Sequence, residues 1–181
     1  MKTEKFNYDL PEHLIAQYPS IQRADSKLLV ALESIQHQVF KDIENYLDKG
    51  DLLILNKTSV IPARLFGEKI TGGKIELLLE RFLSNHQTLT QIRSSRTPKE
   101  GAELVFSFQG QRFLATVEGR QDNFFILNWS DDPKSLFEQY GQIPLPPYMN
   151  RAAEKLDEDR YETIYADPNQ KASVAAPTAG M

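Results

Sequence analysis

The sequence predicts a mixed α/β chain that carries an inserted, small antiparallel β-barrel. Helix-spaced and strand-length apolar segments alternate over residues 1–61, as in an α/β unit. Only strand-length runs separated by turn residues follow over residues 62–130, which is typical of a small barrel or sandwich. Helix signals return over residues 131–181. We therefore expect a barrel at 62–130 between two segments of one α/β domain.

The first α/β segment contains two predicted helices, each followed by a predicted strand. A proline at a first helical position indicates a short helix over residues 11–17, and an apolar run indicates a strand over 28–32. Apolar residues then recur at helical spacing before Gly50, which predicts a helix over 41–49. The run of apolar residues at 51–55 predicts a buried strand directly behind it.

Six strand-length runs define the predicted barrel. They are residues 63–66, 74–82, 88–92, 103–108, 112–118 and 124–129. Gly72 and Gly73 separate the first two runs, and this pair favours a hairpin turn because glycine tolerates positive φ. In the run 74–82, alternate residues are apolar but Leu78 breaks the pattern, so we expect that strand to be partly covered on both faces.

The return segment begins with a helix signal. Asp132 and Pro133 predict a helix that runs through Tyr140 and ends at a glycine. A proline-rich stretch at 144–148 predicts an extended connector. Residues 152–159 are polar and expected to be exposed, and 160–166 have the spacing of a short helix.

Composition excludes several classes of protein. The 181 residues include no cysteine, which rules out disulfide scaffolds, thiolate zinc sites, iron–sulfur clusters and cysteine nucleophiles. The three histidines lie far apart without zinc-like spacing, so we expect no metal. No apolar stretch is long enough to span a membrane, and the first residues do not form a secretory signal. We expect a cytoplasmic protein without a membrane partner.

The charge of the chain is unevenly distributed. The formal net charge is -4, yet residues 51–100 carry eight basic and five acidic side chains. This block is the part of the chain that could face phosphates. A solvated barrel surface explains the same charges equally well.

Several polar and aromatic residues are candidates for binding. Asn56 follows the predicted strand 51–55, where α/β proteins commonly place ligands, and Arg64 offers a planar fork for a phosphate or carboxylate. Asn56 could instead simply shape a turn. Tyr148, Arg160 and Tyr161 belong to an aromatic and basic cluster that could stack on a nucleobase. Amphipathic packing is the favoured alternative for that cluster.

Five segments, in order, closely resemble the S-adenosylmethionine:tRNA ribosyltransferase-isomerase family of queuosine biosynthesis, called QueA. They are residues 56–65 (NKTSVIPARL), 72–76 (GGKIE), 143–148 (IPLPPY), 159–166 (DRYETIYA) and 174–180 (VAAPTAG). Each segment alone is weak evidence for this family, but the five segments in this order are specific to it. The resemblance implies an α/β domain with a small β-barrel, as the pattern of the chain predicts independently.

The resemblance also implies an activity. Family members transfer the ribosyl group of S-adenosylmethionine to 7-aminomethyl-7-deazaguanine at the wobble position of tRNA. They isomerise it to give epoxyqueuosine, and adenine and methionine leave. S-adenosylmethionine is thus the ribosyl-donor substrate, and tRNA carrying the modified base is the partner.

The matching motifs imply a set of substrate-binding residues. They are Asn56, Arg64, Lys74, Tyr148, Arg160, Tyr161, Thr163, Pro177 and Thr178. Removing a proton beside the sulfonium requires a general base, and Glu76 is a weak candidate. A glutamate on a strand, paired with Lys74 or Arg64, is the stronger alternative for Glu76.

The chain departs from the family pattern in two ways. Lys57 and Ser59 stand where the family commonly has asparagine and arginine, which removes one potential phosphate contact. The family also continues after the PTAG motif, usually with Leu-His-Phe, whereas this chain stops at Met181. The resemblance therefore implies an N-terminal half, an incomplete α/β domain and a complementary C-terminal half chain. The alternative is an inactive remnant or a tRNA-binding module.

Overall fold

The computed structural model describes residues 2–180, apart from the side chains of residues 171, 172 and 179. The chain divides into two compact units. The first, here called the N-terminal unit, contains the residues up to Leu55 together with Pro146–Ala152. The second, here called the barrel unit, contains Asn56–Leu145 and the residues from Ala153 onward. The domain limits at 61/62 and 130/131 stay predictions.

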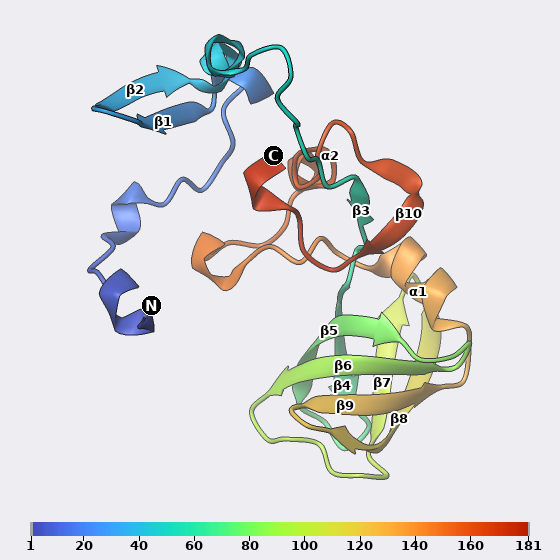
Figure 1. Ribbon diagram of the computed structural model, residues 1–181. Helices are drawn as coiled ribbons and strands as arrows, with labels where there is room; N and C mark the ends of the chain where they lie inside the picture. The colour runs from blue at the N-terminus through green and yellow to red at the C-terminus, as the bar shows by residue number, and fades with distance from the viewer. Residues whose placement is uncertain (1, 181) are drawn as a thin grey trace. The chain divides into compact units, whose positions relative to one another are not determined.

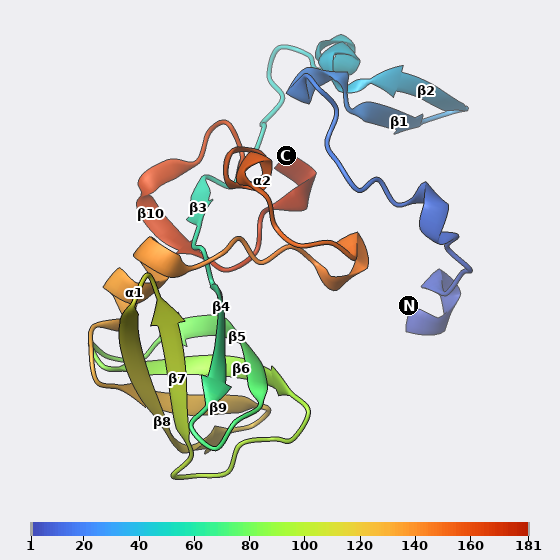
Figure 2. The ribbon, with the colours of Figure 1, turned by 180° about the vertical axis from the view of Figure 1, so that it is seen from behind.

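A closed antiparallel barrel forms most of the barrel unit (Figures 1 and 2). Its strands are β4 (Arg64–Lys69), β5 (Lys74–Phe82), β6 (Gln87–Ser94), β7 (Glu103–Phe108), β8 (Gln111–Gln121) and β9 (Phe124–Trp129). They close in the order β4-β5-β6-β9-β8-β7. The predicted mixed fold class with a small antiparallel barrel is confirmed, because each of the six predicted runs coincides with one strand.

The barrel core follows from the two-residue period of its strands. Ile75, Leu77 and Leu79 of β5 are almost completely buried, while the residues between them are only partly covered. Phe106 and Trp129 pack with ring centroids 5.1 Å apart, inside the same core. The alternation visible in the sequence is therefore what places these side chains inside.

The hairpin between β4 and β5 turns at the predicted glycine pair. Gly72 and Gly73 have φ values of +85° and +101°, which residues other than glycine rarely adopt. The Lys69 amide donates to the Gly73 carbonyl at 3.0 Å across the turn. The hairpin-turn interpretation of this segment is confirmed.

Helix α1 (Pro133–Tyr140) closes one end of the barrel core, as Figure 1 shows. The Asp132 carboxylate caps the helix by accepting from the Lys134 amide at 3.1 Å and the Ser135 hydroxyl at 2.7 Å. Leu136 and Phe137 are buried in the barrel core. The helix predicted at this position is confirmed.

The chain enters and leaves the barrel at neighbouring points. The Arg64 amide donates to the Gln142 carbonyl at 3.1 Å, and the Gln142 amide donates back to the Arg64 carbonyl at 2.8 Å. Arg64 is the first residue of β4, and Gln142 follows α1. These two hydrogen bonds clamp the two ends of the barrel segment together.

The rest of the barrel unit contains one small parallel sheet and two short helices. The sheet pairs β3 (Thr58–Val60) with β10 (Asp167–Ser173). Helix α2 spans Lys155–Arg160, and a 3-10 turn spans Thr178–Gly180.

The helix predicted at 160–166 is wrong, because the helix is α2 and ends where that prediction began. The Glu154 amide donates to the Asp157 carboxylate at 2.8 Å, which starts the helix earlier. Asp157 is also buried, although residues 152–159 were expected to be exposed. The polar sequence of this stretch therefore reflects capping as well as solvent exposure.

The N-terminal unit has little regular structure. It contains an antiparallel hairpin of β1 (Lys27–Ala31) and β2 (Ile35–Val39). It also contains 3-10 turns at Thr3–Phe6, Glu12–Leu14, Arg23–Asp25, Phe40–Tyr46 and Pro147–Met149. The strand predicted at 28–32 is confirmed, whereas the helices predicted at 11–17 and 41–49 are only short 3-10 turns.

The buried strand predicted at 51–55 is wrong for this structure. These residues form no strand, and their four apolar side chains are exposed. An apolar run becomes a strand only when neighbouring strands satisfy its main chain, and no such neighbour lies beside it among the described residues.

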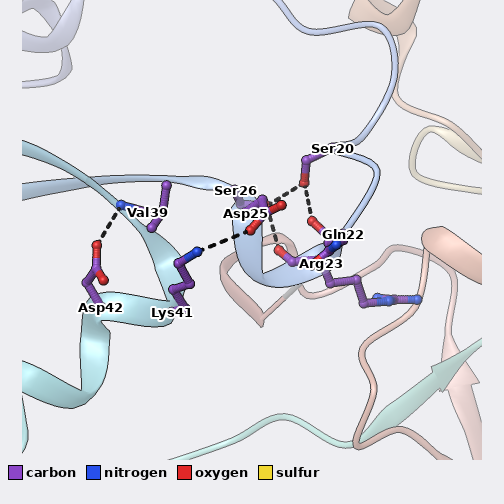
Figure 3. A network of polar contacts seen from close by, with 8 residues as sticks. All are labelled: Ser20, Gln22, Arg23, Asp25, Ser26, Val39, Lys41 and Asp42. Carbon is purple, nitrogen blue, oxygen red and sulfur yellow. Dashed lines mark hydrogen bonds and ion pairs between the residues drawn. The ribbon is translucent and has the colours of Figure 1, made fainter.

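Local polar contacts connect the turns of the N-terminal unit, as Figure 3 shows. The Ser26 hydroxyl donates to the Arg23 carbonyl at 3.0 Å and lies 3.4 Å from the Ser20 hydroxyl. Lys41 and Asp25 form an ion pair at 3.8 Å, and both side chains are well exposed. Exposed pairs of this kind contribute little free energy, so this network shapes turns without supplying a core.

Candidate functional site

The parallel pairing of β3 with β10 joins two distant parts of the chain. Figures 1 and 2 both show these strands side by side. The Asp167 amide donates to the Lys57 carbonyl at 2.8 Å, and the Ile61 amide donates to the Ser173 carbonyl at 2.8 Å. The segment 56–65 therefore lies against the chain that connects the last two matching motifs.

Glu162 fixes the loop after α2 to strand β3. Its carboxylate accepts hydrogen bonds from the Ser59 hydroxyl and, at 2.9 Å, from the Val60 amide. Ser59 is buried and Glu162 partly buried, so water competes weakly for these bonds. One carboxylate thus connects the motif at 56–65 with the motif at 159–166.

Gly180 lies close against the same loop. The Tyr165 hydroxyl donates to the Gly180 carbonyl at 3.0 Å. A Cβ atom on Gly180 would lie 2.2 Å from the Tyr165 hydroxyl and 3.2 Å from the Thr163 methyl group. Only glycine fits without a shift of these neighbours. The motif at 174–180 is thereby joined to the motif at 159–166.

Thr163 carries a buried hydroxyl whose hydrogen-bonding capacity is unused. The residue is only 4% exposed, and its Oγ1 atom has no hydrogen-bond partner among the residues that the structure describes. Buried hydroxyls are nearly always hydrogen-bonded, so an unpaired one is suited to a ligand.

Arg64 is held in a fixed orientation at the start of β4. Its Nε atom lies 3.1 Å from a Glu76 carboxylate oxygen, and its Nη2 atom donates to the Leu145 carbonyl at 2.9 Å. Glu76 and Arg64 are diagonal neighbours on one face of the β4–β5 pair. This ion pair is the alternative to a catalytic role that the sequence predicts for Glu76.

Asn56 shapes a turn in this structure. Its side-chain carbonyl accepts from the Thr58 amide at 2.9 Å and from the Thr58 hydroxyl at 2.6 Å, which is an Asx turn. This turn positions the chain for β3.

The remaining candidates have different environments. Tyr161 is buried, Arg160 and Pro177 are partly buried, and Lys74 and Thr178 are exposed, all within the barrel unit. Lys74 begins β5, Arg160 is the last residue of α2 and Tyr161 follows it. Pro177 directly precedes the 3-10 turn that Thr178 begins. Tyr148 is 56% exposed and belongs to the N-terminal unit.

The sequence alone did not predict Ser59, Glu162, Tyr165 or Gly180 as substrate-binding residues. All four lie within the matching motifs, which was the available signal. Their roles depend on contacts between motifs, and no spacing within one motif reveals those contacts.

Among the described residues, no group of three or more histidine, cysteine or acidic side chains could hold a metal ion. Within the same part of the chain, the search for long apolar helices found no helix that could cross a membrane.

The family described as queuosine biosynthesis protein matches residues 3–181 of the chain. The chain belongs to this queuosine biosynthesis family. The matched region includes all of the motifs that converge around Glu162.

Several curated relatives are named S-adenosylmethionine:tRNA ribosyltransferase-isomerase. The relative from Acinetobacter baylyi is 46% identical over 184 residues, which cover 100% of this chain and 53% of that protein. A relative from Acinetobacter baumannii is 43% identical over 183 residues, which cover 100% of this chain and 52% of that protein. The chain spans about half the length of these relatives.

A solved structure is also similar. The S-adenosylmethionine tRNA ribosyltransferase from Thermotoga maritima is 34% identical, with a TM-score of 0.39. The similarity covers 81% of this chain and 52% of the Thermotoga chain.

Proposed function

We propose that the chain supplies one half of an S-adenosylmethionine:tRNA ribosyltransferase-isomerase. Membership of the queuosine biosynthesis family and the names of the relatives support this function. The structural observation that carries it is the convergence of three motifs around Glu162 and Gly180 in the barrel unit. Motifs that are far apart in sequence but meet in space are typical of a binding site.

The proposed reaction transfers the ribosyl group of S-adenosylmethionine to the aminomethyl group of a 7-deazaguanine at the tRNA wobble position. Isomerisation of that group gives epoxyqueuosine, and adenine and methionine are released. Because the partner is a tRNA that carries this modified base, we propose that the activity is cytoplasmic.

The proposed substrate contacts come from the residues around the three motifs. The unpaired Thr163 hydroxyl fits a polar group of the ribosyl donor, because it can donate or accept one hydrogen bond. Arg64, held by Glu76, fits a carboxylate or phosphate through its remaining N–H groups.

Seven further residues complete the proposed binding set. They are Asn56, Lys74, Tyr148, Arg160, Tyr161, Pro177 and Thr178. We propose Glu76 as the residue that positions Arg64, because its carboxylate lies 3.1 Å from the Arg64 Nε atom.

The half of each relative that this chain does not match indicates a partner polypeptide. Because the chain spans about half of each relative, we propose that activity requires a polypeptide equivalent to their unmatched half. That polypeptide would supply the rest of the donor site and of the α/β sheet.

The test is a product assay with two polypeptides. The chain is incubated with S-adenosylmethionine and tRNA carrying the 7-aminomethyl-7-deazaguanine base, with and without the unmatched half of the Acinetobacter baylyi relative. Mass analysis of digested tRNA should detect epoxyqueuosine only in the mixture. The full-length relative is the positive control.

Absence of product from the mixture, with product from the control, would reject the enzymatic function. Binding of tRNA under the same conditions would then favour the tRNA-binding module instead. Salt dependence of that binding would show whether phosphate contacts contribute to it.

A further inference from the structure

A hollow of about 380 Å³ lies in the barrel unit, beside the turn between β8 and β9 and the loop that follows β6. The residues that line it include Gln91, Thr97, Arg120, Asn123, Phe124 and Phe125. The four polar residues among them are exposed, so the hollow is open to solvent. Pockets for small ligands begin at about 300 Å³, so this hollow is large enough for a single nucleotide or a molecule of similar size.

Arg120 provides a positive charge with a restricted orientation at this hollow. Its guanidinium carbon lies 4.3 Å from the centroid of the buried Phe125 ring, and this stacking limits the freedom of the side chain. Arg120 forms no ion pair with another described residue, and no acidic side chain of the described part of the chain lines the hollow. The N–H groups at the edge of the guanidinium are therefore available to an anion such as a phosphate.

The other lining groups match the base of a nucleotide. The side-chain amides of Gln91 and Asn123 each carry donors and an acceptor, and neither amide is hydrogen-bonded to another described residue. Phe124 is only partly buried, so its ring offers a surface for stacking. Proteins recognise unstacked RNA bases by combining an aromatic face with hydrogen bonds to the base edge. The hollow holds both, next to a cation suited to the phosphate.

The hollow continues the outer face of the strands that carry Arg64. Arg64 pairs with Leu78 across β4 and β5, and Leu78 pairs with Gln91 across β5 and β6. Residues paired in this way share one face of a sheet, so Gln91 lies two strands from Arg64, roughly 10 Å at the usual strand spacing. A few linked nucleotides can span this distance, and Arg64 belongs to the proposed binding set.

A second unpaired cation lies on the same face. Arg93 is exposed, pairs with Glu76 across β5 and β6, and lies two positions from Gln91, which places it on the face of Gln91. Because the Glu76 carboxylate already contacts Arg64, Arg93 has no ion-pair partner among the residues that the structure describes. Unpaired cations beside an aromatic ring are typical of surfaces that bind single-stranded RNA.

We propose that the hollow binds one unstacked nucleotide of the tRNA substrate, a few positions from the nucleotide that is modified. Arg120 contacts its phosphate, Phe124 stacks on its base, and the amides of Gln91 and Asn123 contact the base edge. The inference rests on the proposed function, because it takes tRNA as the substrate. It adds a second nucleotide, which the barrel recognises. The row that joins Gln91 to Arg64 favours a continuous RNA strand over a free mononucleotide.

The experiment measures binding of the full chain to a labelled RNA hairpin that has the loop of a tRNA anticodon arm, by fluorescence anisotropy at several salt concentrations. Phe124→Ala should weaken binding by at least about fivefold, because the stacking of one base is lost. Arg120→Gln should also weaken it, and should reduce the slope of log affinity against log salt by about 0.7, the value for one phosphate of a single strand. Phe124→Ala should leave that slope unchanged.

Two matched controls lie on β8 outside the hollow. Leu114→Ala and Arg112→Gln alter exposed residues, and both should leave the affinity and the salt slope unchanged. Thermal unfolding of all the variants controls for loss of folding, and if Phe124→Ala unfolds, the salt slope of Arg120→Gln decides.

Hairpins with one abasic position each locate the bound nucleotide. One such position should weaken binding to the original chain, but should cause no further loss with Phe124→Ala, because both changes remove the same stacking contact.

The inference is overturned if the original chain does not bind the hairpin, if Phe124→Ala and Leu114→Ala weaken binding equally, or if no abasic position couples to Phe124. A free nucleoside monophosphate that binds as tightly as the hairpin would also overturn it, in favour of a small-molecule site. Loss of hairpin binding in both hollow variants, with no epoxyqueuosine from the two-polypeptide mixture, would retain this inference and reject the proposed reaction. Product formation and hairpin binding that both variants leave unchanged would do the reverse.

Discussion

The Glu162 carboxylate accepts a hydrogen bond from the Val60 amide at 2.9 Å, although the two residues lie 102 positions apart in the sequence. The same carboxylate accepts from the Ser59 hydroxyl. Two neutral donors, the Ser59 hydroxyl and the Val60 amide, therefore connect the two motifs. The contact makes Glu162 the first residue to test.

Replacing Glu162 with alanine should lower the free energy of unfolding by about 1–3 kcal/mol, because two donors at β3 lose a shared acceptor. Urea unfolding at constant pH measures the change. Glu80→Ala, at an exposed position of β5, is the control and should stay within about 0.5 kcal/mol of the original protein. Equal effects of the two substitutions would show that the Glu162 contact is not structural.

Gly180→Ala should destabilise the loop at 159–166, because the added methyl group would lie 2.2 Å from the Tyr165 hydroxyl. Combining it with Tyr165→Phe removes that hydroxyl, so the double variant should recover part of the loss. Thermal unfolding of both single variants and of the double variant measures the coupling.

The matched control for this cycle is Gly119→Ala on β8, where an added methyl group meets nothing within 4 Å. If the changes in the free energy of unfolding caused by the Gly180 and Tyr165 substitutions add strictly, there is no steric conflict between the two positions.

Thr163→Val should separate binding from stability. Because the Thr163 hydroxyl is buried with no hydrogen-bond partner among the described residues, replacing it with a methyl group should not lower the free energy of unfolding and should raise it by up to about 1 kcal/mol. Affinity of the two-polypeptide complex for S-adenosylmethionine, measured by calorimetry, should fall roughly three- to tenfold if the hydroxyl contacts the donor.

Thr88→Val is the contrasting control for Thr163. The buried Thr88 hydroxyl accepts from the Trp129 indole at 2.8 Å, so this variant should lose about 1–3 kcal/mol of stability. A stability loss at position 163 equal to that at position 88, without a change in donor affinity, would contradict the proposed role of Thr163.

Asp132→Ala should lower the free energy of unfolding by about 1 kcal/mol near neutral pH, because helix α1 loses its cap. The hydrogen bond from the Ser135 hydroxyl holds the pKa of Asp132 below its ordinary value of 3.8. The charged form is thus favoured in the folded state, and its contribution is complete above pH 3.8. That contribution disappears as the pH falls through the lower folded pKa.

Denaturant titrations of the Asp132→Ala variant and the original protein at neutral and acidic pH give the test. The difference between them should shrink below pH 3.8. A difference that stays constant down to pH 2 would contradict the capping role of the charged carboxylate.

The barrel was predictable because its strands obey a local rule. In β5 the alternation of Ile75, Leu77 and Leu79 is written in the sequence, and the Gly72–Gly73 turn marks where the strand starts. The cap at Asp132 likewise signals α1 by itself. Each of these features depends on residues only a few positions apart.

The errors occurred where distant chain segments decide the outcome. Residues 51–55 have the composition of a buried strand, but no described strand pairs with them. Helix α2 was misplaced because the Glu154–Asp157 cap outweighed the apolar spacing of 160–166. The sequence also did not predict which residues come together at the site, since the Ser59–Glu162 contact joins residues 103 positions apart.

The clamp between Arg64 and Gln142 has a consequence for how such a chain can change over generations. Because the amides and carbonyls of these two residues already exchange hydrogen bonds, the intervening segment leaves the fold at nearly the point where it entered. A gene could gain, lose or exchange that whole segment with little displacement of the sequences on either side. The closed barrel is therefore a modular insertion. Changes in its size or surface can be tolerated without altering the structure of the motifs outside it.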